Sequence, residues 1–291
     1  MAERVAIAGA GICGLVSALA LAKKGHEVTV FERDGPPPSV DADQAFFEWH
    51  RPGAAQFRHP HAFLALMCNI LEENYPELLE EFFAAGARAV PFRQMISPEL
   101  RENYRPEPGD ERIWILSCRR ATMEAVLRRH VAGHPNVRIV NPCIVEGILS
   151  ETADDIIRVK GLRISGQDGV TRDEPADVVI DATGRTSRFP RWLAEAGAEV
   201  REQRQDAEIV YYTRHYRLNE GEEEPARGNR SGAGDLGYLK YGVFPGDNGH
   251  FAVILCLPNG EDRLKKAVRD GETFDRICRA IPGLEPWVEE T

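Results

Sequence analysis

A glycine-rich segment near the N-terminus has the spacing GxGxxG, which is suited to binding a phosphate group. It consists of Gly9, Ala10, Gly11, Ile12, Cys13 and Gly14. Gly9 would permit a tight turn, Gly11 would let the backbone approach a pyrophosphate, and Gly14 would let a helix pack closely on a strand. N–H groups at the start of the next helix would then face the phosphate charge. Alone, the segment is a weak signal, because ordinary strand-to-helix turns also contain glycines.

An acidic residue at the end of the next predicted strand gives this segment a context. Residues 5–8 are an apolar run that predicts a buried strand before the glycines, and apolar residues recur at helical spacing after them. Residues 27–31 predict a second strand, which ends at Glu32. A carboxylate there can accept hydrogen bonds from a ribose diol, whereas the structural alternative is a solvated charge. The βαβ pattern therefore predicts dinucleotide binding and fits both NAD and FAD.

The rest of the chain predicts an α/β protein in two parts. The first part should contain a loop at residues 35–57 and helical stretches at 61–85 and 121–131. An antiparallel insertion should follow at 137–164, and a buried strand at 177–180 should return to the first sheet. The second part should be built on a sheet from the β-rich runs 209–218, 238–244 and 250–257. We therefore expect one domain over residues 1–200 and a second over 201–291.

Composition and charge exclude several classes of protein. Apolar residues make up 43% and charged residues 28%, the balance of a globular chain. The 46 acidic and 36 basic residues give a net charge of −10, which provides no broad attraction for nucleic acid. The six cysteines form no CxxC pair, and no segment stays apolar long enough to span a membrane. We expect a cytoplasmic protein that binds a small molecule.

Further segments carry a resemblance to a known family. They are Arg33 directly after Glu32, the helix-opening residues 118–124, the helix-heading residues 56–61, and the Ala182-Thr183-Gly184 turn. Together they resemble the single-component FAD-dependent monooxygenases, the aromatic hydroxylases and polyether epoxidases. The residues 56–61 are most similar to the epoxidase-like branch. The resemblance implies FAD, NAD(P)H as electron donor, and an FAD-binding Rossmann-like βαβ domain with a second, β-sheet-based substrate domain.

The resemblance also assigns cofactor contacts. The segment from Gly9 to Gly14 would cradle the FAD pyrophosphate, and Glu32 would hold the adenosine ribose. Further contacts are implied for Arg33 at the adenine end, Arg58 towards the flavin, Arg120 near the phosphates, Val145 at the adenine, and Ala182 and Gly184 in the second strand-to-helix turn. The residues alone also allow an exposed charge at Arg33, a surface ion pair at Arg120 and a core position for Val145.

The sequence departs from the family in two places. Members commonly carry Asp-Gly where this chain has Thr183-Gly184, a position at which NAD(P)H docks. Members also carry a Gly-Asp motif that contacts the ribityl chain of FAD, and no such motif is found before Thr291. Gly246-Asp247 has the letters, but its surroundings predict a hairpin turn. The chain resembles a family member that lacks its C-terminal part.

The family's chemistry, in which reduced flavin activates O2, needs no catalytic side chain, and none is assigned here. Aromatic residues of the second sheet could line an apolar substrate pocket, namely Tyr211, Tyr212, Tyr238, Tyr241 and Phe244, or could be plain core. His59 and His61 lack metal-ligand neighbours, so no metal is expected. One of them could contact the flavin or an oxyanion, or could instead cap a helix or pack against other residues. The function implied is an FAD-dependent monooxygenase of a small organic molecule. A flavin-dependent reductase or dehydrogenase, or a non-catalytic nucleotide-binding module, are the alternatives.

Overall fold

The computed structural model describes residues 1–38, 41–96, 98–154, 156–225 and 232–289. The chain divides into two compact units, each built from two stretches of sequence. Unit 1 contains residues 1–57 and 123–204, and unit 2 contains residues 58–122 and 205–291. The stretch 58–122 thus joins the same compact unit as the C-terminal sheet. That FAD belongs to one domain and the substrate to another, divided near residue 200, stays a prediction.

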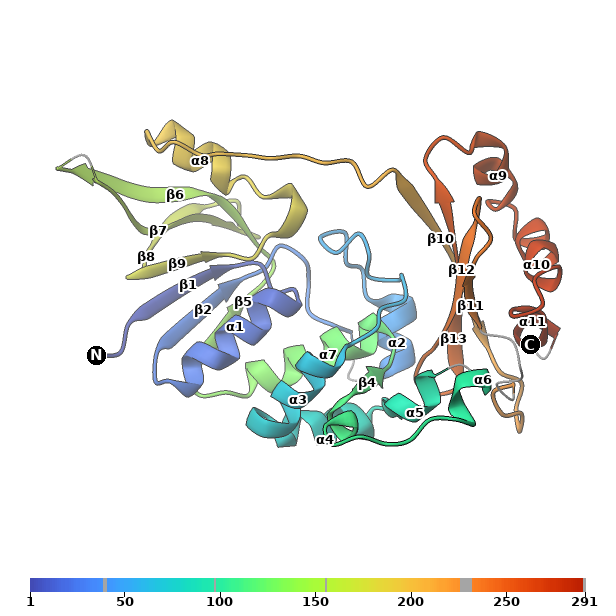
Figure 1. Ribbon diagram of the computed structural model, residues 1–291. Coiled ribbons are helices and arrows are strands. Elements are labelled where there is room, and N and C mark those ends of the chain that lie inside the picture. Colours follow the sequence, from blue (N-terminus) through green and yellow to red (C-terminus); the bar gives the residue numbers. More distant parts are fainter. Residues whose placement is uncertain (39–40, 97, 155, 226–231, 290–291) are drawn as a thin grey trace. The chain divides into compact units, whose positions relative to one another are not determined.

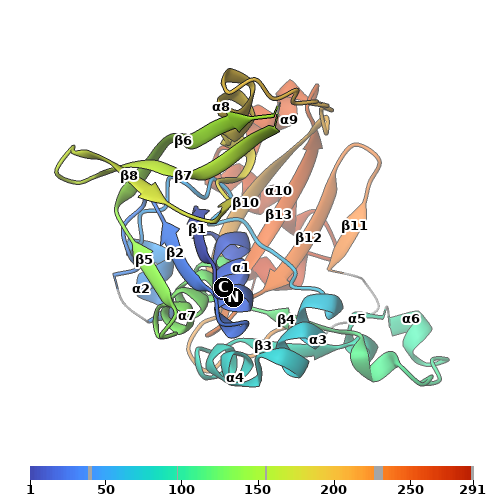
Figure 2. The same cartoon turned by 90° about the vertical axis from the view of Figure 1, so that its left-hand side faces the viewer.

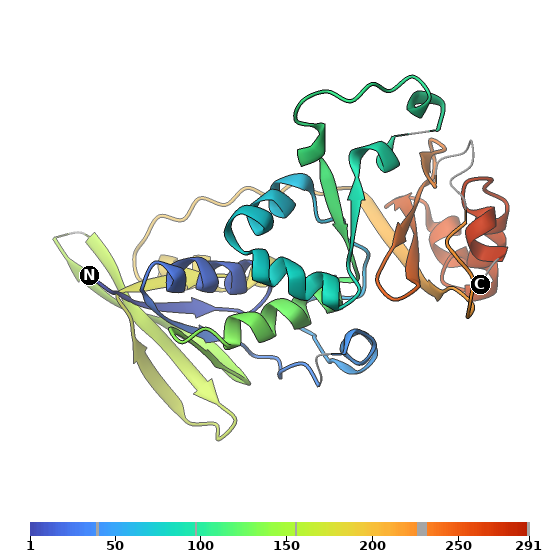
Figure 3. The same ribbon diagram turned by 90° about the horizontal axis from the view of Figure 1, so that it is seen from below.

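Unit 1 is built on a parallel sheet with the strand order β5-β2-β1-β9. Its strands are β1 (Arg4–Ala8), β2 (Glu27–Phe31), β5 (Val137–Val140) and β9 (Val178–Asp181). Strands β1 and β2 are nearly continuous apolar runs because both faces of a parallel sheet are covered. Helix α1 (Ile12–Lys23) runs along the strands of this sheet in Figure 3. The predicted βαβ unit is therefore confirmed.

An antiparallel sheet lies on the side of the parallel sheet opposite α1 (Figure 1). It contains β6 (Cys143–Ala153), β7 (Ile156–Gly166) and β8 (Thr171–Pro175), which confirms the predicted antiparallel insertion. Apolar side chains of both sheets and of α8 (Phe189–Glu195) share one core. The remaining elements of unit 1 are α2 (Ala42–Glu48), the short 3-10 helix η2 (Gly184–Thr186) and most of α7 (Arg120–Ala132).

The loop expected at residues 35–57 is wrong in part, because α2 lies inside it. Asp41 caps this helix by accepting hydrogen bonds from the backbone N–H groups of Asp43 and Gln44, both at 2.9 Å. An N-terminal cap of this kind contributes about 1 kcal/mol, enough to favour a helix that lacks a clear apolar period. The expected helix over 61–85 likewise divides into α3 (Ala65–Asn74) and α4 (Pro76–Ala84), since Pro76 begins a new helix.

Unit 2 is built on an antiparallel sheet with the order β10-β13-β12-β11, and Figure 2 shows these strands side by side. They are β10 (Ile209–Arg217), β11 (Ala233–Asp235), β12 (Lys240–Pro245) and β13 (His250–Pro258). One face of this sheet packs on three helices, α9 (Asp262–Ala267), α10 (Gly271–Arg279) and α11 (Glu285–Glu289) (Figure 1). The predicted second sheet is confirmed, and the chain has the predicted α/β fold.

The first stretch of unit 2 adds helices and a two-stranded sheet. Besides α3 and α4 it contains β3 (Arg88–Pro91), α5 (Phe92–Met95), α6 (Pro98–Arg101), the 3-10 helix η1 (Asp110–Arg112) and β4 (Trp114–Ser117). Strand β3 pairs antiparallel with β4, and Phe63 forms a bridge to Leu116. Of the helices that the structure describes, none is long and apolar enough to cross a lipid bilayer.

Candidate functional site

The glycine turn of unit 1 is closed towards the protein and open at its middle. Gly9 has φ +100°, a backbone conformation that favours glycine, and a Cβ there would lie 2.5 Å from the carbonyl oxygen of Ala182. A Cβ on Gly14 would lie 1.9 Å from the carbonyl oxygen of Gly9. Gly11, by contrast, has no atom within 4 Å of its Cβ position. The turn therefore leaves room for a ligand at Gly11, as a pyrophosphate cradle requires.

The start of helix α1 offers N–H groups to such a ligand. Gly11 is its N-cap and provides no side-chain hydrogen bond to the first turn. Ile12 is half-buried and Cys13 is exposed. Because the first N–H groups of a helix have no partner inside it, they can bind an anion. The residues present thus fit the diphosphate of a dinucleotide cofactor.

Glu32 lies against the same turn. It is 5% exposed, and its Oε2 accepts a hydrogen bond of 2.7 Å from the N–H of Ala10. Its Oε1 accepts one of 2.9 Å from the N–H of Asp34, and Arg51 Nη1 lies 3.2 Å from Oε2. Burial raises the pKa of Glu32, but the charge of Arg51 and the two N–H groups lower it overall, so the carboxylate is ionised. A carboxylate has roughly four acceptor sites, which leaves about one for a ribose hydroxyl.

Arg51 organises a buried charge cluster behind Glu32, and we missed it in the sequence. Its guanidinium lies 3.2 Å from Asp34 Oδ2 and 3.1 Å from Glu124 Oε2, with the side chain 2% exposed. Burial lowers the pKa of Arg51, but the charges of Glu32, Glu124 and Asp34 raise it overall. Arg128 lies nearby, 4% exposed, and burial lowers its pKa to about 10. Arg51 stands in the expected loop, and its carboxylate partners come from separate segments, so no local pattern points to it.

The other predicted cofactor residues of unit 1 are placed as follows. Ala182 directly follows β9 and donates its N–H to the carbonyl of Ala8 at 2.8 Å, which brings the second turn next to Gly9. Gly184 begins η2 with φ +80°. Arg33 has an exposed side chain that reaches the carbonyl of Pro52 at 3.4 Å. Val145 pairs with Ile164 in the antiparallel sheet and packs into the core beside it.

In unit 2, Arg120 binds His61 and fixes the form of its ring. Arg120 Nη1 lies 3.2 Å from His61 Nε2, and His61 Nδ1 lies 2.8 Å from the carbonyl oxygen of His59. A guanidinium only donates, so Nε2 must accept and Nδ1 must carry the proton. His61 is therefore neutral and positions Arg120. Arg58, for which the resemblance implies a contact towards the flavin, has an exposed side chain. Its carbonyl oxygen accepts a hydrogen bond from His215 Nε2.

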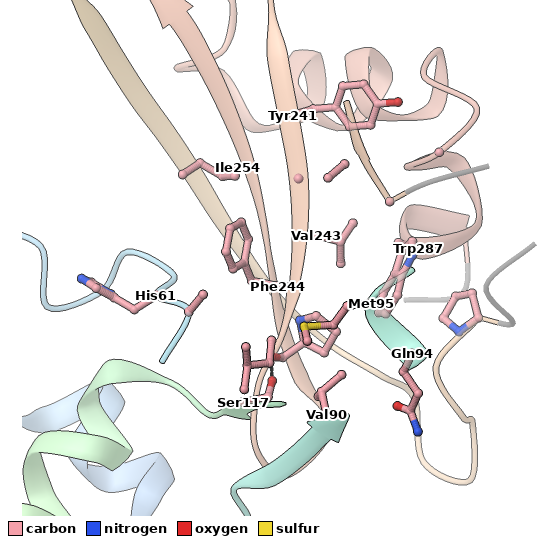
Figure 4. A pocket seen from close by; sticks show the side chains of 18 of the residues that line it. His61, Val90, Gln94, Met95, Ser117, Tyr241, Val243, Phe244, Ile254 and Trp287 are labelled. Carbon is pink, nitrogen blue, oxygen red and sulfur yellow. Dashed lines mark hydrogen bonds between the residues drawn. The ribbon is translucent and has the colours of Figure 1, made fainter. Parts of the chain in front are cut away.

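Unit 2 also contains a cavity of 680 Å³. Of the five aromatic residues for which lining and plain core were both open, Tyr211, Tyr241 and Phe244 line it, whereas Tyr212 packs into the core and Tyr238 is 57% exposed. Figure 4 shows labelled side chains from β12, β13, α5 and α11 around this space, with His61 at one end. Within the described ranges, no group of three or more His, Cys, Asp or Glu could hold a metal ion.

The Gly246-Asp247 pair is a hairpin turn, as the sequence predicted, because it joins the antiparallel strands β12 and β13. Asp247 is 0% exposed and binds the segment that leads into α7. It accepts hydrogen bonds from the N–H of Arg119 at 2.7 Å, from Arg119 Nε at 3.0 Å and from Thr122 Oγ1 at 2.8 Å. The turn is thus a buried structural anchor.

Asp247→Asn should strongly destabilise unit 2. The change removes the carboxylate charge that pairs with Arg119, whose side chain is buried. Removing one partner of a buried pair costs about 3–5 kcal/mol, and urea unfolding measures this loss. Asp235→Asn removes a carboxylate that pairs with Lys240 at the surface of the same sheet, and it should leave the unfolding free energy nearly unchanged. Equal stability of the two variants would contradict the anchoring role.

Comparison with known proteins agrees with this geometry. Residues 4–95 match the family model described as FAD dependent oxidoreductase. The search of curated protein sequences found no match. Among solved structures, PqsL, a probable FAD-dependent monooxygenase from Pseudomonas aeruginosa, is 15% identical with a TM-score of 0.67, covering 100% of this chain and 70% of PqsL. PqsL has also been solved in complex with 2-aminobenzoylacetate, and that structure is 14% identical with a TM-score of 0.67, covering 100% of this chain and 71% of that chain.

A second kind of flavoprotein shares the architecture. The myxobacterial chondrochloren halogenase CndH, an FAD-dependent halogenase, is 20% identical with a TM-score of 0.60, and the match covers 99% of this chain and 59% of CndH. At these identities the likeness establishes the fold. Residues 4–95 are thus similar to the FAD dependent oxidoreductases, and the chain as a whole shares the fold of PqsL and CndH.

Proposed function

We propose that this chain is an FAD-dependent monooxygenase that hydroxylates or epoxidises a small organic molecule with NAD(P)H and O2. The observation that carries the proposal is the cavity of unit 2, in a chain whose unit 1 has a nucleotide cradle. Among the described residues that line the cavity there is no Asp or Glu. These residues therefore provide no pair of carboxylates for acid–base catalysis, which agrees with reactive chemistry supplied by a bound cofactor.

The residues of unit 1 divide the work of holding FAD. The open side of the turn at Gly11 and the start of α1 would hold the diphosphate, and the ionised carboxylate of Glu32 would accept a ribose hydroxyl. FAD, when bound, would pass electrons from NAD(P)H to O2. The apolar walls of the cavity would orient the substrate and exclude water.

The proposed reaction balances with one oxygen atom in the product and one in water. For hydroxylation, R–H, NAD(P)H, H⁺ and O2 give R–OH, NAD(P)⁺ and H2O, so NAD(P)H supplies both electrons that the second oxygen atom needs.

All six cysteines of the chain are free thiols, which agrees with a reducing compartment such as the cytoplasm.

The purified chain should be yellow, or should become yellow when FAD is added, and should oxidise NAD(P)H with consumption of O2. With an accepted substrate under labelled O2, mass spectrometry should find one labelled oxygen atom in the product. Protein that FAD cannot reconstitute would overturn the assignment. Reduction of a double bond without labelled oxygen would indicate a reductase or dehydrogenase, and transfer of halide would indicate a halogenase. Folded protein that binds FAD but never consumes O2 would indicate a nucleotide-binding module.

A further inference from the structure

The cavity of unit 2 has one charged side chain among the described residues that line it, Arg101. The neighbouring polar groups already have partners within the protein. Ser117 donates its hydroxyl to the carbonyl of Pro245, and His61 is bound by Arg120. Since no described lining residue is Asp or Glu, the charge of Arg101 is not balanced from within the cavity.

Arg101 is held in position but lacks acceptors. It lies in α6, is half-buried, and donates from Nη2 to the carbonyl oxygen of Ile96 at 2.9 Å. Its Nε is buried and finds no acceptor among the residues that the structure describes, and no described carboxylate lies within ion-pair distance. Its Nη1, by contrast, is not buried and has no hydrogen-bond partner among the described residues, so it would donate to an anion in the cavity. A guanidinium matches the two oxygen atoms of a carboxylate because it presents donors in a planar fork.

The walls of the cavity fix the chemistry of the rest of the ligand. Successive residues of β12 point to opposite sides, so Phe244 and Val243 face different parts of the space. Figure 4 shows Phe244 and Ile254 on one side of this strand and Val243 and Trp287 on the other. Aromatic walls favour flat aromatic ligands, because stacked and edge-on ring contacts add to the burial of apolar surface. The volume of 680 Å³ suits a molecule of more than one ring.

We propose that this cavity binds an ionised aromatic carboxylic acid, with its carboxylate on Arg101 and its rings against Trp287. The inference deepens the proposed function, on which it rests for the claim that the occupant is the substrate. The binding itself needs no turnover, so it is tested separately.

The test uses 2-naphthoate and its uncharged counterpart 2-naphthylmethanol, titrated into the full chain by calorimetry at neutral pH. The acid should bind about tenfold more tightly than the alcohol, since a charge-assisted contact is worth about one factor of ten in affinity. Arg101→Gln should abolish this preference and leave the affinity for the alcohol unchanged. Arg93→Gln is the matched control, because Arg93 lies on neighbouring α5, is exposed and does not line the cavity. Trp287→Leu should weaken both compounds together.

Each outcome decides the question. The proposal is overturned if neither compound binds, if the acid has no advantage, or if Arg101→Gln keeps that advantage. An unchanged melting temperature of the Arg101 variant shows that a lost preference is not a folding effect. If the acid binds through Arg101 but FAD does not bind, the ligand assignment stands and the monooxygenase proposal fails. If FAD and O2 chemistry are found but the acid has no advantage, the monooxygenase proposal stands and the ligand assignment fails.

Discussion

Gly14→Ala should weaken FAD binding by up to about 100-fold and destabilise unit 1. The new Cβ would lie 1.9 Å from the carbonyl oxygen of Gly9 and 3.3 Å from the Cβ of Ala182. Neither the carbonyl group nor the strand behind it can yield easily, so α1 must move away from the turn. Overpacking of this kind costs about 1–3 kcal/mol, and a loss of 3 kcal/mol corresponds to about a 100-fold weaker affinity. Urea unfolding and fluorescence titration of FAD into the apo-protein measure the two effects.

Gly11→Ala is the matched control, because it separates the cofactor from the fold. Gly11 has φ −76°, which alanine adopts, and open space around its Cβ position. The stability should therefore stay nearly unchanged, while a methyl group in the space assigned to the pyrophosphate should weaken FAD binding by about tenfold or more. If Gly11→Ala bound FAD as the unmodified chain does, the pyrophosphate would not approach the turn at this residue.

Arg51→Met should also strongly destabilise unit 1, although Arg51 needs no contact with the cofactor. The change leaves Glu32, Asp34 and Glu124 buried with much less compensating charge, and breaking a buried ion pair costs about 3–5 kcal/mol. Urea unfolding measures the loss. Arg138→Met removes an arginine on β5 whose side chain is 64% exposed, and it should have little effect. A small loss for Arg51→Met would mean that water or Arg128 compensates the carboxylates.

The same variant should weaken the pH dependence that Glu32 contributes. In the unmodified chain the pKa of Glu32 is lowered overall, so its stabilising contribution is present above its unfolded pKa of about 4.5 and is lost as the pH falls through the lowered value. Without Arg51 the strongest of the influences that lower this pKa is lost, so the folded pKa of Glu32 rises. The difference in stability between the two proteins should therefore shrink as the pH falls through the interval between their two folded pKa values.

The strands and the glycine turn could be predicted from sequence because local patterns encode them. Buried parallel strands are apolar runs, and the close approach of Gly14 to Gly9 is the packing that the GxGxxG spacing predicts. The position of Glu32 against Ala10 also agrees with the prediction. Its contact with a ribose, and every other predicted cofactor contact, stays a prediction.

The charge pairs could not be predicted, because they join distant segments. Arg119 and Asp247 are 128 residues apart, and the partners of Arg51 come from β2's end and from α7. Each of these residues alone has the pattern of an ordinary surface charge. Helix α2 was missed for another reason, since its cap at Asp41 follows a proline-rich stretch that is typical of a loop.

The buried carboxylate of Asp247 connects the wall of the cavity in unit 2 with the residues around Arg120. Its hairpin extends β12, whose Phe244 and Pro245 line the cavity, and its oxygen atoms bind residues on both sides of Arg120, namely Arg119 and Thr122. Short charge-assisted bonds stretch little, so a ligand that shifts the hairpin also shifts the backbone that carries Arg120. One buried carboxylate therefore holds both the wall of the cavity and the backbone on either side of Arg120.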